Sequence, residues 1–507
     1  MIRELMTDIL REAPLLEESL QRYGDLTLGE YCDMLARKGQ EVTEEIMPSG
    51  DVTEAVRAYL SPLVGEELAE QTAQQVLEQK LLLTANHHEV EYCVQALQGN
   101  LLYDYVIEKM GFTEGIVPIF SNTTVNMSNE NFPRGIQVYH THTQMERFPV
   151  FPFKQRNSLV AAAEGFTREN LMQTRKNILR NQINGTLEPR TAECMVDLLD
   201  QVYQEEEVLK EKQYAKQAVI VNQVLGKRLF CDSEKKFLYI ELEEISTRLL
   251  LKDLQREDGL VEKLLFREEY QKKLTQELEG KTGCWDTKGR KGTWFFWGID
   301  AKKRRVSMVP QQRGEKMYLT GVDMEGNEYA YPFDRESVVD LLHERRILPG
   351  LFLSFLELYF LRSFTMAGGC FQSLYLKDMN EGLCHTLAAV GGHEHEIAIL
   401  REKQCWYLSG PMFLLGYHCR QSEDRQVFPL GTIEILERGG ITGEQFRDAL
   451  QITMRQSQEV GIYNFYTDLI PKSQWKDRWY QNLSGSFSRS SNYPESIWFE
   501  WKGGTSQ

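Results

Sequence analysis

The spacing of hydrophobic and polar positions changes several times along the chain, and each change predicts a different kind of structure. In residues 1–79 apolar side chains recur every three or four positions, as in residues 28–35 and 52–64, which predicts amphipathic helices. Asp51 follows a Pro-Ser-Gly break and is expected to cap the next helix. We therefore expect a helical N-terminal region over residues 1–79.

Short apolar runs replace the helical spacing between residues 80 and 165. Lys80–Asn86 and Gly115–Phe120 predict strands that are buried on both faces, and residues 89–110 between them predict a helix. Gly135–Tyr139 predicts a third strand. A strand–helix–strand unit with a further strand indicates an α/β sheet unit in this part of the chain.

Residues 166–280 return to a helical pattern and carry many charges. A long, charged helical stretch is typical of a solvated scaffold or of an arm that mediates assembly. No heptad pattern is sustained through it, so a coiled coil is not expected. If the protein forms a homo-oligomer, we expect residues 166–280 to mediate the contact.

Turns become frequent from residue 281 onward. Two predicted hairpins, residues 293–309 and 317–331, together indicate a four-stranded meander, and Asp334 is expected to cap the helix that follows. Ile347–Phe364 is the most hydrophobic segment, but it contains Glu357 and Arg362. We expect this segment to be a buried core helix rather than a membrane span.

These patterns define the expected fold class, α/β (mixed α+β). It consists of the helical N-terminal region (1–79), a central sheet unit that holds the candidate site (80–165), a long charged helical insertion (166–280), and a C-terminal α+β half (281–507) with the meander and the hydrophobic core helix. No low-complexity linker separates these regions, so we expect them to form one body.

Composition and charge narrow the classes of function. The chain has 507 residues, is 42% hydrophobic and carries a formal net charge of −16, which argues against binding to nucleic-acid phosphates. The nine cysteines are scattered without a Cys-x-x-Cys pair, which indicates reduced thiols. The first twenty residues predict an amphipathic helix rather than a secretion signal. We expect a cytoplasmic protein that binds neither nucleic acid nor membranes.

Histidine is the residue most unevenly distributed along the chain. Of its nine histidines, six occur in three close pairs, which are His87 with His88, His140 with His142, and His393 with His395. Imidazole both binds metals and transfers protons near neutral pH. The three pairs are therefore the first candidates for chemistry.

The pair His87 and His88 follows Asn86 at the predicted end of a strand, where a helix is about to begin. In open α/β sheets ligands bind beyond the carboxyl ends of the strands. We expect His87 or His88 to act as a general acid or base, with Asn86 orienting it. The alternative is that these histidines cap the helix or fill a hydrogen-bonded turn.

The pair His140 and His142 ends the third predicted strand. Two histidines separated by one residue lie on the same face of a strand and can bind one metal ion. A divalent metal is the expected cofactor: zinc with His87 or His88 as a third ligand, or iron with a carboxylate from Glu89 or Glu146. The alternative is two exposed loop histidines. The third pair, His393 and His395, predicts a polar, solvent-facing strand.

An anion-binding role is expected for Arg134, which lies between proline and glycine and can present its planar guanidinium to a carboxylate or phosphate. Asn122 and Thr124 could add hydrogen bonds to the same ligand, and Gln372 lies in a second glycine-rich break. If the second and third strands run antiparallel, Arg134 lies near His87 and the three-histidine metal site fails. Ordinary turns are the alternative at both places.

No nucleotide-cofactor motif is present, because the chain lacks a P-loop and a dinucleotide-binding glycine pattern, and it also lacks a nucleophile elbow. The sequence favours a cytosolic enzyme that acts on a small polar metabolite, anionic or amino-acid-like, by histidine acid–base or metal-assisted chemistry. The alternative is a non-catalytic protein that binds a small ligand, or a scaffold with a helical assembly arm.

Overall fold

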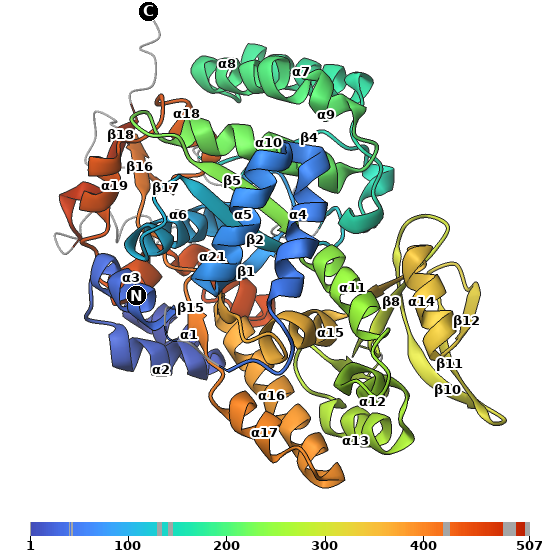
Figure 1. The fold of residues 1–507 in the computed structure, drawn as a ribbon. Coiled ribbons are helices and arrows are strands. Elements are labelled where there is room, and N and C mark those ends of the chain that lie inside the picture. Colours follow the sequence, from blue (N-terminus) through green and yellow to red (C-terminus); the bar gives the residue numbers. More distant parts are fainter. Residues whose placement is uncertain are drawn as a thin grey trace, which may run out of the picture.

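The computed structural model describes residues 2–39, 41, 44–128, 134–139, 145–289, 291–418, 426–479 and 493–501. The expected fold class is confirmed: helices surround a parallel sheet, and small antiparallel sheets lie around it (Figure 1).

The central sheet has five parallel strands in the order β15-β14-β1-β2-β5. The strands are β1 (Leu81–His87), β2 (Ile116–Asn122), β5 (Lys236–Glu241), β14 (Thr365–Gly368) and β15 (Cys405–Tyr407). Numbered by their order in the chain and read across the sheet from β5, the strands follow the order 3-2-1-4-5. This is a doubly wound order: successive strands are added on one side of β1 up to β5, and the next strand, β14, is added on the other side of β1.

Helices cover both faces of this sheet, which explains why its inner strands are apolar on both sides. Leu83 and Ile119 pack with α6 (Val94–Lys109) on one face. Leu82 and Met366 pack on the other face, in one cluster with residues of four helices: α4 (Gly50–Val64), α5 (Glu66–Gln79), α11 (Leu242–Asp253) and α16 (Cys370–Val390).

The strands β1 and β2 confirm two of the three strands predicted in residues 80–165. The third, β3 (Gly135–Val138), is a strand but does not join the central sheet. It pairs with β4 (Glu146–Pro149) as a separate antiparallel hairpin. The link from β2 to β3 is at the lower limit of about a dozen residues for a parallel crossover, which usually contains a helix.

The chain between β2 and β5 forms a layer over the loop that follows β1. Val90 and Tyr92 of that loop share a hydrophobic cluster with Ile136 and Phe148 of the β3–β4 hairpin. We call residues 123–128, 134–139 and 145–215 the covering segment. In Figure 1 its helices lie at the opposite end of the molecule from α17 (Glu394–Arg401). The helices and short turns of this part of the chain are η1 (Phe153–Gln155), η2 (Val160–Ala162), α7 (Arg168–Ile183), α8 (Pro189–Leu198), η3 (Leu199–Tyr203), α9 (Glu206–Lys210) and α10 (Tyr214–Leu229).

The prediction that residues 166–280 are helical throughout was wrong, because β5 lies within them and forms one edge of the central sheet. This strand has only six residues and begins with a lysine after a charged stretch, so its apolar signal is short. The helices that follow α11 are α12 (Leu260–Phe266) and α13 (Glu268–Leu278).

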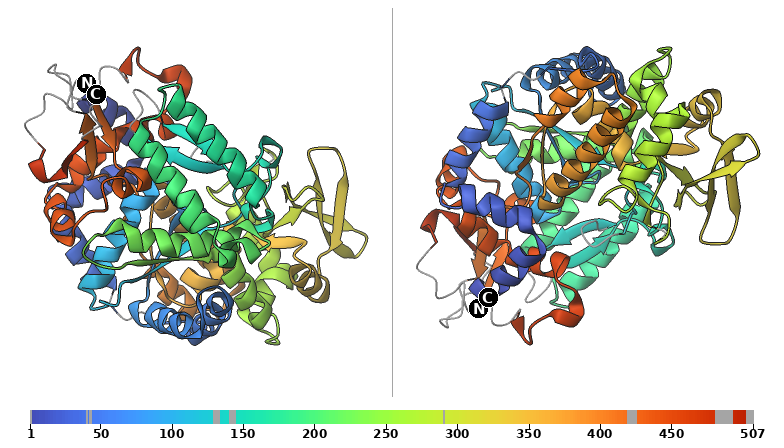
Figure 2. Two further views of the ribbon diagram at one scale, coloured as in Figure 1. Left: turned by 90° about the horizontal axis from the view of Figure 1, so that it is seen from above. Right: turned by 90° about the horizontal axis from the view of Figure 1, so that it is seen from below.

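The predicted four-stranded meander is instead two three-stranded sheets, in the orders β13-β8-β9 and β10-β11-β12. The two predicted hairpins, β8 with β9 and β11 with β12, are present, and Asp334 caps its helix by accepting from Ser337 N at 2.9 Å. Figures 1 and 2 show β10–β12 projecting from one side of the molecule. The elements are β6 (Trp285–Asp286), β7 (Lys291–Gly292), β8 (Phe296–Ile299), β9 (Arg305–Ser307), β10 (Val309–Arg313), β11 (Lys316–Val322), β12 (Glu328–Pro332), α14 (Arg335–His343) and β13 (Ile347–Pro349).

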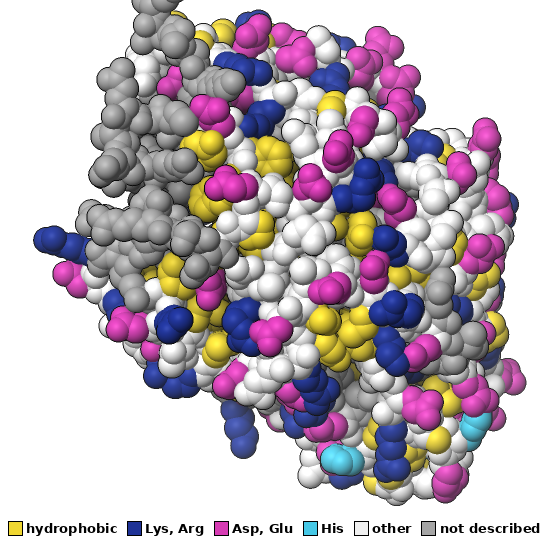
Figure 3. Space-filling view, turned by 90° about the vertical axis from the view of Figure 1, so that its left-hand side faces the viewer, with side chains coloured by type: hydrophobic (Ala, Val, Ile, Leu, Met, Phe, Trp, Pro, Cys, Tyr) yellow, Lys and Arg dark blue, Asp and Glu magenta, His cyan; other side chains and the backbone are white. Residues whose placement is uncertain are grey.

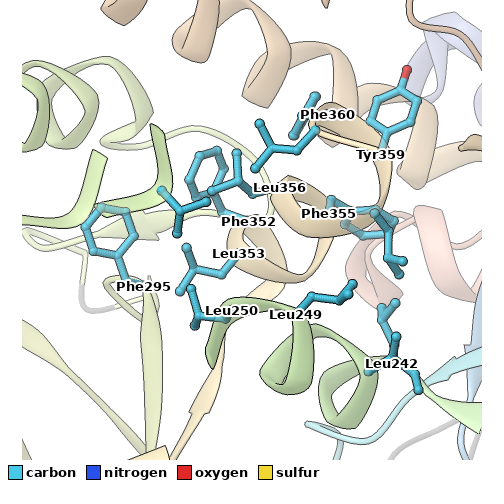
Figure 4. Close-up of a cluster of buried hydrophobic side chains, with 14 of the residues drawn as sticks. Leu242, Leu249, Leu250, Phe295, Phe352, Leu353, Phe355, Leu356, Tyr359 and Phe360 are labelled. Atoms are coloured by element: carbon cyan, nitrogen blue, oxygen red, sulfur yellow. The ribbon is translucent and has the colours of Figure 1, made fainter. Parts of the chain in front are cut away.

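The segment Ile347–Phe364 is buried as expected, but it is not one helix. It forms β13, then α15 (Leu351–Phe355), then the π-helical turn η4 (Leu356–Phe360). Figure 4 shows Leu353 of α15 next to Leu250 of α11, and both belong to one buried cluster. Among the residues with described positions, no helix has both the length and the apolar character needed to span a bilayer.

The N-terminal region is helical as expected. Asp51, however, does not cap α4, whose N-cap residue is Ser49; the Asp51 carboxylate instead meets Arg256 at 3.0 Å. The first helices are α1 (Ile2–Glu12), α2 (Pro14–Tyr23) and α3 (Leu28–Gly39), and the C-terminal elements are β16 (Leu415–His418), β17 (Gln426–Pro429), α18 (Thr432–Leu436), α19 (Gly443–Ala449), α20 (Met454–Val460), α21 (Ile462–Leu469), η5 (Lys472–Gln474), η6 (Glu495–Ile497) and β18 (Trp498–Trp501).

Candidate functional site

A β-bulge near the carboxyl end of β1 determines which side its last polar residues face. Leu83 pairs with Ile119, whereas Asn86 pairs with Ser121, so β1 contains one residue more than β2 over this interval. Side chains alternate along a regular strand, and the extra residue reverses the alternation. Asn86 therefore faces the same side as Leu83, toward α6.

Asn86 belongs to a buried hydrogen-bond network at this end of the sheet. Its side-chain nitrogen lies 2.9 Å from Asn100 Oδ1 on α6 and 3.2 Å from the hydroxyl of Tyr239 on β5. The Tyr239 hydroxyl in turn donates to Glu91. Burial raises the pKa of Glu91 to about 7, although its hydrogen bonds oppose the rise. The side-chain oxygen of Asn86 has no partner among the described residues.

His88 is fully buried, and both of its ring nitrogens are hydrogen-bonded. Nε2 lies 2.9 Å from the carbonyl oxygen of Ala215, and Nδ1 lies 2.7 Å from Ser121 Oγ. A carbonyl oxygen can only accept, so Nε2 carries the proton of the neutral ring, and Ser121 donates its hydroxyl to Nδ1. Burial lowers the pKa of His88, which keeps the imidazole neutral.

A fixed negative charge lies beside His88. The carboxylate of Glu241 accepts a hydrogen bond from Lys216 at 2.6 Å and another from the Tyr59 hydroxyl at 3.2 Å. Burial alone would raise the pKa of Glu241, but the positive charge of Lys216 outweighs burial and the pKa is about 2. Any positive charge that forms on His88 is therefore stabilised by Glu241.

The loop after β2 is held by Glu243 at the start of α11. Its Oε2 accepts from the backbone N–H and the hydroxyl of Thr123, each at 2.7 Å, and its Oε1 accepts from Thr124 N at 3.2 Å and Oγ1 at 2.9 Å. Asn122 Oδ1 also accepts from Thr124 N at 2.9 Å. In this structure Asn122 and Thr124 bond within the protein, and their substrate-binding role stays a prediction.

His87 is the last residue of β1 and is partly buried. Burial lowers its pKa to about 4, so the imidazole is neutral at pH 7. A neutral histidine can accept a proton but is a poor general acid at this pH. The acid–base role predicted for His87 stays a prediction.

Arg134 lies at the start of the β3–β4 hairpin rather than at the sheet edge. Its guanidinium donates to the carbonyl oxygen of Phe151 at 3.0 Å and lies over the ring of Phe153, with 5.3 Å to the ring centroid. Asn86 and His88 both contact Tyr239, so the structure brings these two together. Arg134 instead contacts Phe151 and Phe153, which belong with it to the covering segment.

The two candidate metal ligands His140 and His142 lie outside the described residues. His88, the proposed third ligand, has both ring nitrogens engaged with protein atoms. Over the ranges that the structure describes, no group of three or more histidine, cysteine, aspartate or glutamate side chains could hold a metal ion. The metal site stays a prediction that depends on His140 and His142.

The strand predicted for His393 and His395 was wrong, because this segment forms the helix α17, whose N-cap residue is His393. His393 Nε2 lies 2.8 Å from the Tyr270 hydroxyl, and His395 Nε2 lies 3.2 Å from a carboxylate oxygen of Glu44. The acidic first turn of α17 suits a helix N-terminus, where negative charge is favourable.

Gln372 lies where the strand order reverses. Its amide nitrogen donates to the hydroxyl of Thr84 on β1, while its amide oxygen has no partner within the described part of the chain, and the residue is only 3% exposed. This residue was predicted from its glycine-rich surroundings, and its substrate-binding role stays a prediction.

The sequence did not identify the residues that surround Asn86 and His88. Glu89 is 2% exposed, its Oε2 has no partner in the described ranges, and burial followed by the charge of Glu91 raises its pKa. The occurrence of both glutamates within one short loop next to apolar residues could have signalled this buried pair. Tyr239 and Glu241 were missed together with β5.

Comparison with known proteins assigns no family to the chain. No protein-family model matches it, and no curated protein and no solved structure matches it either. The function must therefore be argued from the site itself.

Proposed function

We propose that this protein is an enzyme that binds a small polar metabolite at the carboxyl edge of its five-stranded sheet and transfers a proton there. One observation carries the proposal: two buried polar atoms, at the end of β1 and in the loop that follows it, have no hydrogen-bond partner among the residues with described positions, namely Asn86 Oδ1 and Glu89 Oε2. Folded proteins leave few such atoms unpaired. A polar ligand that reaches them is the explanation that the doubly wound strand order favours.

The proton-transfer pair of this proposal is Ser121 with His88. The hydroxyl proton of Ser121 moves to His88 Nδ1 while the Ser121 oxygen takes up a proton from the substrate. The bond from Nε2 to the Ala215 carbonyl fixes the tautomer, and the Glu241 carboxylate stabilises the imidazolium that forms. Return of the proton by the same route completes the cycle.

Access to this pair requires movement of the covering segment. Ser121 and His88 are each 0% exposed. The carbonyl oxygen that bonds His88 belongs to Ala215, the last residue of the covering segment. Enclosed sites commonly open and close over a substrate, which excludes water during the reaction. We propose that the covering segment has this role.

The substrate class follows from the side chains at the edge. The unpaired oxygens of Asn86 and Glu89 accept hydrogen bonds, so they suit the amino or hydroxyl groups of a polar, amino-acid-like metabolite. Figure 3 supports a small-molecule substrate over nucleic acid, since acidic and basic side chains are interspersed on the described part of the face that it shows. The cysteines with described positions are all free thiols, which supports the proposed cytoplasmic location.

Metabolite profiling tests the proposal before any substrate is identified. The purified protein is incubated with a polar metabolite extract, and mass spectrometry records which compounds disappear or form. We expect wild type to convert at least one compound, and Ser121→Ala and His88→Gln to convert it at least about a hundredfold more slowly, the usual range of acid–base catalysis. His395→Gln, at a histidine with 68% side-chain exposure, is the matched control and should retain wild-type activity.

The alternative function gives a different result in the same assay. A binding or scaffold protein would retain a compound during gel filtration but leave its mass unchanged. Conversion that persists in both Ser121→Ala and His88→Gln would overturn the proposed proton-transfer pair. Elemental analysis of the same preparations tests the metal-assisted version, which requires stoichiometric zinc or iron.

A further inference from the structure

The amino edge of the central sheet, opposite the edge of the proposed function, carries two lysines and a serine. The neighbouring strands β1, β14 and β15 begin there, and β14 is the middle strand of the three. Lys80 directly precedes β1, Ser363 lies two residues before β14, and Lys403 lies two residues before β15. The two lysines therefore enter the sheet on either side of Ser363.

The amine of Lys403 is held by a hydroxyl group rather than by a carboxylate. Its Nζ donates to Ser363 Oγ at 2.6 Å, and the Ser363 hydroxyl in turn donates to the carbonyl oxygen of Glu44. Within the described ranges no carboxylate forms an ion pair with Lys403, which is partly buried. Removing a charged ammonium from water without a counter-charge is unfavourable, so this environment favours the neutral amine.

Lys80 adds a second positive charge at the same place. Its Nζ donates to Ser49 Oγ and lies 3.7 Å from a carboxylate oxygen of Glu45. Burial and then the charge of Lys80 lower the pKa of Lys403 to about 7, while the charge of Glu45 opposes the fall. With both amines protonated, these three charged groups would carry one positive charge in excess.

The consequence is an amine that reacts at neutral pH. At pH 7 about half of the Lys403 side chains are neutral, compared with about one in three thousand for a lysine with the ordinary pKa of 10.5. Only the neutral amine has the lone pair that attacks an electrophilic carbon. Burial and a neighbouring cation are the means by which enzymes activate lysine nucleophiles.

We propose that Lys403 is a modification site that takes up carbon dioxide as a carbamate. The lone pair of Nζ forms a bond to the carbon of carbon dioxide, one C=O electron pair moves to its oxygen, and the nitrogen releases a proton to water. The charge of Lys80, which repels the ammonium form of Lys403, attracts the negative carbamate.

Carbon dioxide suits this position better than a larger electrophile does. It is small and uncharged, so it can reach a partly buried amine without a preformed pocket. The ring of Phe364, over which Lys80 Nζ lies at 4.8 Å from the centroid, makes the surroundings partly apolar. The modification requires neither His88 nor Ser121, so the inference goes beyond the proposed function and does not depend on it.

Carbon-13 NMR of the full chain in ¹³C-labelled bicarbonate, which supplies dissolved carbon dioxide, tests the proposal. At pH 7 we expect wild type to show a carbamate signal from Lys403 beside that of the α-amino group, whose ordinary pKa is about 8. Lys403→Gln, which keeps a donor for Ser363, should lose the first signal and keep the second.

Two further variants separate the role of the neighbouring charge from a general effect of lysine loss. Lys80→Gln should weaken the Lys403 signal by about threefold or more, because Lys403 then keeps its proton more often and its carbamate lacks a cation. Lys302→Gln, at a lysine with 61% side-chain exposure, is the matched control and should give wild-type signals.

Chemical labelling of the unmutated protein gives a second measurement, which does not depend on the folding of any variant. Acetic anhydride acetylates neutral amines, and mass spectrometry of the digest reports the rate at each lysine. Compared with chloride at the same ionic strength, bicarbonate should slow acetylation of Lys403 by about twofold or more relative to Lys302, since carbamate formation removes the free amine by mass action.

Three outcomes would overturn the proposal: no carbamate signal besides that of the α-amino group, a second signal that persists in Lys403→Gln, or acetylation of Lys403 that bicarbonate leaves unchanged. His88→Gln should form the carbamate as wild type does. Failure of the proton-transfer pair and failure of this site therefore give different results.

Discussion

The protonation of His87 gives a prediction whose size can be worked out from the structure. The perturbation is a fall in pH from 7 to 5, compared between wild type and His87→Gln. The pKa of His87 is about 4 in the folded protein and 6.5 in its ordinary state. Between these values the unfolded chain binds more protons than the folded protein does, so stability falls as the pH falls.

The expected loss is about 2 kcal/mol. At pH 5 most unfolded chains carry a protonated His87, whereas most folded molecules do not, and the proton-linkage relation converts this difference to about 2 kcal/mol. His87→Gln has no titrating group there and should lack this part of the loss. Glu91, whose folded pKa is raised to about 7, changes stability in the opposite direction, but it does so in both proteins and cancels in the comparison.

Urea unfolding at pH 7 and pH 5, followed by tryptophan fluorescence, measures the difference. A titration of ¹³C-labelled histidine by NMR, with His87→Gln identifying the signal, gives the pKa directly. Equal losses of stability in the two proteins, or a His87 signal that titrates near pH 6.5, would refute the reasoning. In that case His87 would be open to solvent and able to act as an acid as well as a base.

Three further predictions concern buried polar contacts. Glu243→Gln turns an amide N–H₂ toward groups that donate to the carboxylate, and urea unfolding should show a loss of about 2–4 kcal/mol. Arg362→Met leaves the buried Glu357 without its cation and leaves Asp253 with Arg256 alone, and a thermal melt should show a loss equivalent to about 3–5 kcal/mol, whereas no loss would mean that Glu357 is neutral. Tyr239→Phe removes a hydrogen bond that lowers the pKa of Glu91, so the pKa of Glu91 should rise further in the folded variant. The unfolding free energy of the variant should then fall more steeply than that of wild type as the pH rises from 5 to 8.

The strands that could be predicted are those with apolar runs of six or seven residues. Lys80–Asn86 and Gly115–Phe120 gave β1 and β2, because strands buried on both faces are continuous apolar runs. β14 and β15 have only four and three residues, so periodicity cannot distinguish them from loops. The doubly wound order could be recognised only once these short strands were seen to pair.

The sequence predicted where in the fold the candidate residues lie, but not which residues they contact. Asn86 and His88 were identified because a strand was expected to end beside them. Their neighbours Ser121 and Tyr239 depend on the bulge in β1 and on β5, and no sequence signal marked either one. Arg134 was assigned to the same site because β3 was expected to join the central sheet, whereas it pairs only with β4.

Hydrogen–deuterium exchange tests the central claim, that a polar ligand binds at the carboxyl edge of the sheet, even while the ligand is unidentified. Exchange is recorded by mass spectrometry for the full chain with and without a polar metabolite extract. The account predicts slower exchange in peptides that cover the ends of β1, β2 and β14. Unchanged exchange at these three places, or slowing confined to the projecting strands β10–β12, would contradict it.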